Sequence, residues 1–162
     1  MAEEQLNEEM QNKVLNGYRV AGTIFRTLVE ELEERFGKEV AHDIARAAVR
    51  RKGLAAGTAA AAVVGKGGLR QVAAAHQRAF AGDHIAELSD TRYLVHDDRC
   101  GIVEGWRSAG LSAERIKELA DLYCWGDLAY AQAFNPNIKL QFLSRIAEGA
   151  PRCRWLYTLD EE

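Results

Sequence analysis

The sequence lacks the features that mark membrane, secreted and nucleic-acid-binding proteins. No apolar run approaches the roughly 20 residues needed to span a bilayer, and the first ten residues are too polar and acidic for a secretory signal. Lys plus Arg number 21 and Asp plus Glu number 24, so the net charge of −3 gives no general attraction to nucleic acid or to an anionic membrane. We therefore expect a cytoplasmic protein with no nucleic-acid or membrane partner, and a homo-oligomer is left open.

Cysteine is scarce, and the common cofactor motifs are missing. The three cysteines cannot all pair within one chain, and a reducing compartment keeps them as thiols. Gaps of 24 and 29 positions separate Cys100, Cys124 and Cys153, whereas zinc sites usually bring two ligands close together, as in C-x2-C. His96 and Cys100, four positions apart, leave a mononuclear metal site as an alternative. No nucleophile-elbow, HExxH or dinucleotide-binding motif occurs, so we predict no cofactor.

What is present suits one globular domain covering residues 1–162. The apolar fraction is 48% and the charged fraction is 28%, both near globular averages. We predict a helical half, residues 1–80, and a sheet-containing half, residues 81–162, which carries the candidate site.

Apolar residues recur every three or four positions from Val14 to Phe36, which predicts an amphipathic helix ended by Gly37. A second helix is predicted over residues 39–52, with Val40, Ile44, Ala47 and Ala48 facing inward and Gly53 after its end. Residues 53–68 are ambiguous, because an alanine run favours helix while several glycines favour breaks. A third helix is predicted over residues 69–80.

The second half alternates between strand and helix signals. Residues 84–89 and 91–96 predict a hairpin, and Asp98 is predicted to cap a helix that runs to about residue 109. Ser112 is predicted to cap one long helix that continues past residue 128. Period-two alternation over residues 138–146 and 153–159 predicts two further strands. The fold class we expect is α+β, with a small antiparallel sheet covered by helices on one face.

The three cysteines occupy different local settings in the sequence. Cys100 should lie in the first turn of a helix, where the helix dipole lowers a thiol pKa and favours a nucleophile; the alternative is a small buried hydrophobe. Cys124 and Asp127 are three positions apart and so share one helix face. Asp127 then either bonds a structural partner or serves as an acid, a base or an anchor for a cation. Cys153 opens a strand and is consistent with core packing.

An ordered set of residues resembles the L-2-amino-thiazoline-4-carboxylic acid hydrolase family. The residues of this set are Arg99-Cys100, Glu104, Trp106, Gly110-Leu111, Tyr123-Cys124-Trp125-Gly126-Asp127, Phe134-Asn135-Pro136, and Glu148-Gly149 before Cys153. The resemblance spans most of the chain and is most specific between about Arg99 and Tyr157.

The resemblance implies a hydrolase that opens a small cyclic amidine at a carbon–nitrogen bond, producing a carbamoyl-cysteine from the namesake substrate. On that basis we assign catalytic roles to Cys100, Asp127 and Cys124. The expected substrate-binding residues are Cys153, Asn135, His96, Arg99 and Trp106. Arg99 or Arg154 is expected to hold the substrate carboxylate.

Three other functions remain open at this point. The same scaffold could bind a small ligand without catalysis, or a metal-dependent hydrolase could use the cysteines as ligands. A helical interaction module would instead expose an apolar stripe between Val14 and Phe36.

Overall fold

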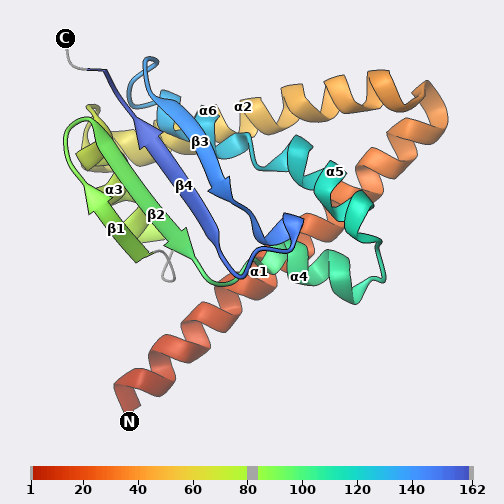
Figure 1. Cartoon of the computed structure of the whole chain (residues 1–162), viewed down its shortest axis with the longest axis horizontal. Coiled ribbons are helices and arrows are strands. Elements are labelled where there is room, and N and C mark those ends of the chain that lie inside the picture. The colour runs from red at the N-terminus through yellow and green to blue at the C-terminus, as the bar shows by residue number, and fades with distance from the viewer. Residues whose placement is uncertain (1, 80–83, 161–162) are drawn as a thin grey trace.

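A computed structural model describes residues 2–79 and 84–160, and its fold is α+β, as predicted (Figure 1). In chain order the elements are α1 (Ala2–Phe36), α2 (Lys38–Val64), α3 (Leu69–Ala79), β1 (His84–Leu88), β2 (Arg92–Asp97), α4 (Gly101–Ser108), α5 (Ala113–Tyr123), α6 (Gly126–Gln132), β3 (Lys139–Ser144), the short 3-10 turn η1 (Ile146–Glu148) and β4 (Cys153–Thr158). The helix predicted over residues 69–80 is present, and its predicted last residue, Phe80, lies outside the described residues. No helix in the described ranges combines the length and the hydropathy that crossing a bilayer requires.

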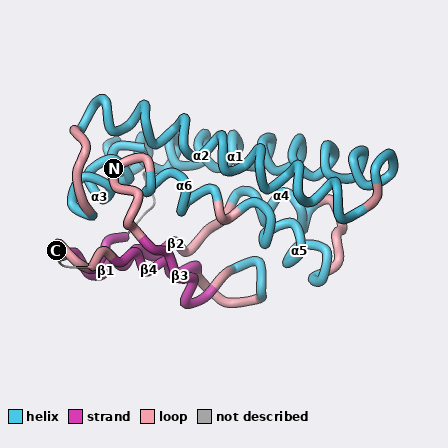
Figure 2. The backbone as a smooth tube through the Cα atoms, turned by 90° about the horizontal axis from the view of Figure 1, so that it is seen from above, coloured by secondary structure: helices cyan, strands magenta, loops and turns pink. Residues whose placement is uncertain are grey.

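The four strands form one antiparallel sheet in the order β1-β2-β4-β3. All the helices lie on one side of this sheet (Figure 2), which confirms the predicted arrangement. The register of the two central strands pairs Val95 with Trp155 and Asp97 with Cys153. Because side chains alternate along a strand, these four residues share the face that the helices cover.

The first two helices form a hairpin that turns at Gly37, whose φ of 79° is a conformation that glycine adopts easily. The predicted end of the first helix after Phe36 is therefore confirmed. The long helix α1 packs along α4, and the buried indole N–H of Trp106 donates a 2.9 Å hydrogen bond to the carbonyl of Gly22. This contact holds α4 against α1.

The second helix runs to Val64, so the predicted stop near residue 52 is wrong. Gly53 does not end α2; it permits close packing against α6. A Cβ atom at Gly53 would lie only 2.4 Å from the carbonyl oxygen of Gly126, and one at Gly57 would lie 2.2 Å from that of Tyr130. These glycines therefore serve the approach of two helices rather than a chain break.

The inward face predicted for α2 is also wrong. Val40 and Ile44 are 48% and 42% exposed, whereas Ala41, Ala45 and Val49 are buried. Ala41, Ala45 and Val49 follow one another at intervals of four and so share one helix face, which turns inward; Val40 and Ile44 lie off that face. The structure thus turns α2 away from the face that hydrophobicity alone indicates.

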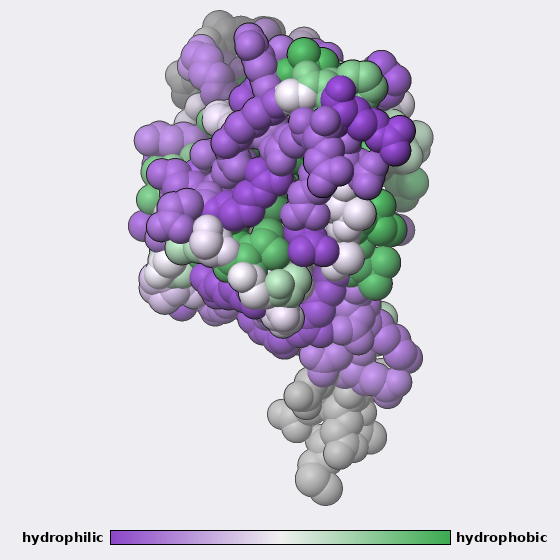
Figure 3. All heavy atoms as spheres, turned by 90° about the vertical axis from the view of Figure 1, so that its right-hand side faces the viewer, coloured by the Kyte–Doolittle hydropathy of each residue, from purple (hydrophilic) through white to green (hydrophobic). Residues whose placement is uncertain are grey.

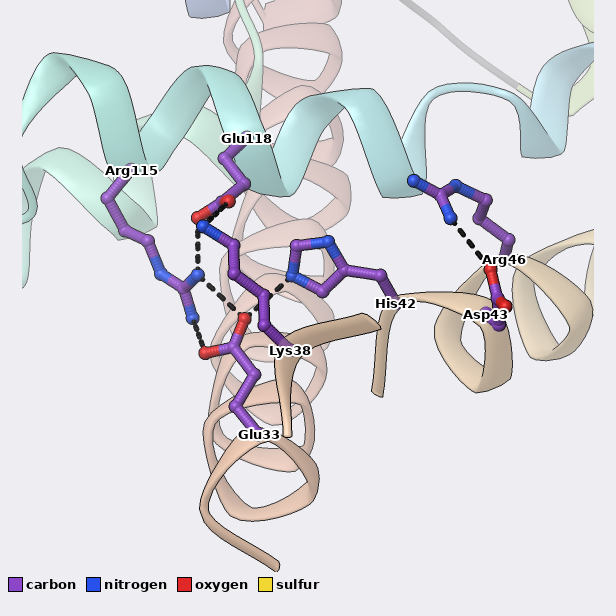
Figure 4. A network of polar contacts seen from close by, with 7 residues as sticks. All are labelled: Glu33, Lys38, His42, Asp43, Arg46, Arg115 and Glu118. Carbon is purple, nitrogen blue, oxygen red and sulfur yellow. Dashed lines mark hydrogen bonds and ion pairs between the residues drawn. The ribbon is translucent and has the colours of Figure 1, made fainter. Parts of the chain in front are cut away.

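An ion network ties the hairpin to α5 (Figure 4). The guanidinium of Arg115 donates to both carboxylate oxygens of Glu33, at 2.9 and 2.7 Å, and to Glu118 at 2.6 Å. His42 lies 2.7 Å from Glu33, and Lys38 forms an ion pair with Glu118. Each of α1, α2 and α5 contributes to this network, which therefore fixes how they meet.

Candidate active site

Three thiols and one carboxylate line a single cavity of about 270 Å³. Cys100 comes from the start of α4, Cys124 and Asp127 come from the α5–α6 junction, and Cys153 comes from β4. The remaining wall includes residues of α1, among them Tyr18. The fold therefore brings together side chains that lie as far apart in sequence as Cys100 and Cys153.

Asp127 lies in the first turn of α6, and its carboxylate makes no hydrogen bond or ion pair with another described residue. Burial raises the pKa of its carboxyl from 3.8 to about 6, and the positive charge of Lys52 partly opposes this shift. A carboxyl with this pKa can release or accept a proton near neutral pH. It is also a ready anchor for a cationic ligand group.

A break between two short helices aims Cys124 and Asp127 at the cavity. The single long helix predicted here is wrong, because α5 ends at Tyr123 and α6 begins at Gly126. The backbone N–H of Asp127 donates to the carbonyl of Cys124 at 3.1 Å. Gly126 packs on Val49 of α2, where an added Cβ would lie 3.0 Å from the valine Cγ1.

The local environment of Cys100 differs from the prediction. Asp98 does not cap α4, because Cys100 itself occupies the N-cap position and Asp98 pairs with Arg152 at 2.9 Å. Hydrogen bonds from the backbone amides of Val103 and Ile102 lower the thiol pKa, as expected at a helix N-terminus. Burial outweighs them and raises the pKa to about 12, so the thiol is protonated in the unliganded protein.

The other two cysteines are also protonated thiols. Burial raises the pKa of Cys124 far above its usual range, and the nearby charge of Asp127 adds to the shift. Burial likewise raises the pKa of Cys153 to about 11, although its Sγ accepts a 3.3 Å hydrogen bond from the N–H of Ile146. Any thiol chemistry in this cavity therefore needs a base or a cationic ligand.

The local sequence analysis gave no role to Tyr123, which lines the cavity beside Cys124 and Asp127. Burial raises its pKa to about 12, and the charges of Asp127, Cys124 and Cys100 act in the same direction. Lys52 lies 5.5 Å from the centre of its ring. The position beside Cys124 in the family-like segment was the one available signal.

Two further residues line the cavity only because distant segments of the chain pack together. Asp97 lines the cavity because its strand register sets it opposite Cys153. His76 of α3 also lines it, and a ring nitrogen lies 3.1 Å from the hydroxyl of Tyr93. Burial lowers the pKa of His76 to about 4, so the ring is neutral near pH 7.

Charged side chains of both signs line the cavity: Asp97, Asp98, Asp127, Arg99 and Arg145. Arg99 lines the cavity and binds Glu104 at 3.0 and 3.2 Å through two nitrogens. Arg19 forms an ion pair with the same carboxylate. Arg99 and Arg19 share the single carboxylate of Glu104, so the guanidinium of Arg99 can also bind an anionic ligand group.

Other residues predicted to bind substrate lie elsewhere. His96 and Arg154 pair across β2 and β4 on the opposite face of the sheet, with 3.4 Å between their Nε2 and Nε atoms. Asn135 accepts a 2.9 Å hydrogen bond from the N–H of Asn137 in the turn after α6 and does not line the cavity. Trp106 does line it, but its N–H is already bonded to Gly22.

The cysteines do not form a metal-like cluster. Within residues 2–79 and 84–160, the group of three or more potential ligands with all ligand atoms within 4.8 Å is Glu33, His42 and Glu118. Arg115 and Lys38 already neutralise those two carboxylates (Figure 4). The geometry therefore does not favour a metal centre built from the cysteines.

Comparison with known families gives one match. The family model described as L-2-amino-thiazoline-4-carboxylic acid hydrolase matches residues 17–157. This range contains the three cysteines and Asp127. No curated protein matches the chain.

Proposed function

Because the chain belongs to the L-2-amino-thiazoline-4-carboxylic acid hydrolase family, we propose that it hydrolyses a small cyclic amidine in the cavity lined by the three cysteines and Asp127. The family description supplies the general activity of a hydrolase. One observation supports the more specific proposal: an unpaired carboxylate, with a pKa of about 6, shares a small cavity with three thiols.

The charges of the cavity match the two ends of such a substrate. A protonated amidine is a planar cation, and Asp127 can accept charge-assisted hydrogen bonds from it. A substrate carboxylate would then face Arg99, which lines the same cavity and shares Glu104 with Arg19. This orientation places the amidine carbon beside the thiols.

Cys100 is our proposed nucleophile, since two backbone amides of α4 stabilise its thiolate. A bound cation lowers the pKa of a nearby thiol, and Asp127 can accept the released proton. The Cys100 sulfur then bonds to the amidine carbon, one ring bond to that carbon breaks, and the departing atom takes up a proton. Water next adds to the same carbon and expels the Cys100 thiol, which leaves a carbamoyl group on the product.

Product analysis identifies which ring bond breaks. Cleavage of the ring carbon–nitrogen bond, the expectation from sequence, frees an amine and leaves the carbamoyl group on sulfur. Cleavage of the carbon–sulfur bond would instead release a free thiol. Mass spectrometry together with a thiol reagent distinguishes the two products.

The decisive experiment measures turnover of L-2-amino-thiazoline-4-carboxylate by the wild type and by matched variants. Cys100→Ser and Asp127→Asn should each lower kcat by at least a hundredfold, which is the usual scale for losing a nucleophile or a base. Cys153→Ser removes a thiol from the same cavity and should keep most of the activity. Equal activity of Cys100→Ser and Cys153→Ser would exclude Cys100 as the nucleophile.

Substrate binding by Cys100→Ser separates catalysis from simple binding. Calorimetry should show that this variant still binds the substrate. If the wild type binds cyclic amidines and turns over none of them, the protein is a ligand-binding member of the family and the catalytic proposal fails.

The role of Arg99 has its own test. Arg99→Ala should raise KM for the carboxylated substrate and leave KM for 2-amino-2-thiazoline, which lacks the carboxylate, unchanged. An equal rise for both substrates would show that Arg99 acts on the shape of the rim instead.

A further inference from the structure

The outward face of α1 carries an uncovered apolar stripe. Val20, Ile24 and Leu28 are 61%, 64% and 53% exposed and follow one another at intervals of four. They lie opposite the face that packs on the rest of the chain, which includes Gly22 and the buried Val29. A run of large apolar side chains on one exposed helix face is typical of a contact surface.

Gly17 lies on this stripe, and no contact within the chain accounts for it. A glycine inside a helix costs about 0.5 to 1 kcal/mol relative to alanine. Gly22 and Gly105 are explained by the close contact between α1 and α4, but nothing lies within 4 Å of a Cβ built at Gly17. A small residue at this point leaves room for a second helix to approach.

Opposite charges on α1 lie at equal distances before and after Gly22. Lys13 and Glu31 are equally distant from Gly22, as are Glu9 and Arg35, and Val20 and Ile24. The charged residues are largely exposed and pair only within α1, Glu9 with Lys13 and Glu31 with Arg35. If two copies of α1 lay antiparallel and centred on Gly22, each of these charges would lie beside an opposite charge of the second copy. If the two copies lay parallel and in register, like charges would lie side by side.

We propose that a second copy of this chain binds along α1, antiparallel and related by a two-fold axis near Gly22. Val20 then packs on Ile24 of the second copy, and Lys13 faces its Glu31. The contact from Glu9 to Arg35 would extend over roughly 39 Å at 1.5 Å per residue. Such a symmetric contact uses the same surface on both copies and therefore closes as a dimer.

The dimer would also support a wall of the cavity. Leu15 and Tyr18 of α1 line the cavity, and the amino-terminal part of α1 projects beyond the sheet and the other helices (Figure 1). A projecting helical segment gains little from its own hydrogen bonds in water.

Figure 3, which views the side with the α1–α2 turn, shows a mostly hydrophilic surface interrupted by separate hydrophobic patches.

Charge reversal and mass measurement test this proposal. The wild type should elute, with mass measured by light scattering, at twice the chain mass of 18.0 kDa. Lys13→Glu and Glu31→Lys should each shift the protein towards monomer. An equimolar mixture of the two should restore the dimer, because every facing pair is then opposite in charge. Lys139→Glu, an exposed lysine on β3 that pairs with Asp160, is the control and should stay dimeric.

An apolar-to-charged substitution gives the second arm. Ile24→Glu should be monomeric, and Val63→Glu, which alters a residue 66% exposed on α2, should remain dimeric. Far-ultraviolet circular dichroism verifies that each variant is folded. A monomeric wild type at 50 to 100 μM, a dimeric Ile24→Glu, or a mixture that stays monomeric would each overturn the proposal.

Discussion

Replacing Asp127 with asparagine should stabilise the protein in a pH-dependent way. The carboxyl pKa rises from 3.8 to about 6 on folding, so the folded protein holds this proton more tightly than the unfolded chain does. The contribution of protonated Asp127 to the free energy of unfolding is therefore fully present below about pH 4 and is lost as the pH rises through 6. Above pH 7 the buried charge costs the protein about 2 to 3 kcal/mol, at 1.36 kcal/mol per pKa unit.

Asparagine has nearly the same shape and carries no charge, so it removes this cost. The free energy of unfolding of Asp127→Asn should exceed that of the wild type by about 2 to 3 kcal/mol at pH 8. The difference should shrink towards zero by pH 4, where the wild-type carboxyl is already neutral. An acidic side chain that lowers the free energy of unfolding when it is ionised needs a functional reason to be kept.

Urea denaturation, followed by circular dichroism at several values between pH 4 and pH 8, measures this difference. Asp43→Asn is the matched control, because its exposed carboxylate pairs with Arg46 at 3.0 Å and should change stability by no more than about 0.5 kcal/mol. If Asp127→Asn is no more stable than the wild type at pH 8, or if its gain does not vary with pH, then Asp127 is not held as a costly buried charge.

Three other outcomes follow from the same structure. Gly53→Ala places a methyl group 2.4 Å from a backbone oxygen and should lower the free energy of unfolding by about 3 kcal/mol, measured by thermal or urea unfolding; a variant as stable as the wild type would contradict the close helix contact. At pH 7.5, iodoacetamide should alkylate the cysteines of the unliganded protein at least tenfold more slowly than it alkylates the thiol of free glutathione, because the pKa of Cys100 is about 12. Rapid alkylation of the protein would contradict this burial. The kcat/KM of the proposed hydrolysis should rise with pH through about 6 as Asp127 ionises, and a profile that is flat between pH 5 and pH 7 would exclude Asp127 as the base.

Much of the fold was predictable because it depends on local patterns. The long apolar periodicity gave α1 and its end at Gly37, and the serine hydroxyl of Ser112 does accept the N–H of Arg115 at the start of α5. The hairpin signal gave β1 and β2, and period-two alternation gave β3, β4 and the helix-covered face. Each of these signals lies within a few residues of the element that it specifies.

The predictions that were wrong depended on contacts between distant segments. Gly53 appears as a helix stop in the sequence, yet it is a contact point for α6, because only the folded chain brings Gly126 to it. Local spacing likewise gave no reason for α5 to end at Tyr123. His96 was grouped with the site because it is close in sequence to Cys100, but the strand sends it to the other face of the sheet.

The sequence by itself determined which chemical groups are available: three thiols, one helical carboxylate and an arginine near the first cysteine. Only the tertiary structure decided their chemistry. Burial raises the pKa of Asp127 to about 6 and keeps the thiols protonated, overriding the helix-terminus effect expected at Cys100. The physical reason is that desolvation depends on every segment packed around a group, and no local stretch of sequence contains that information.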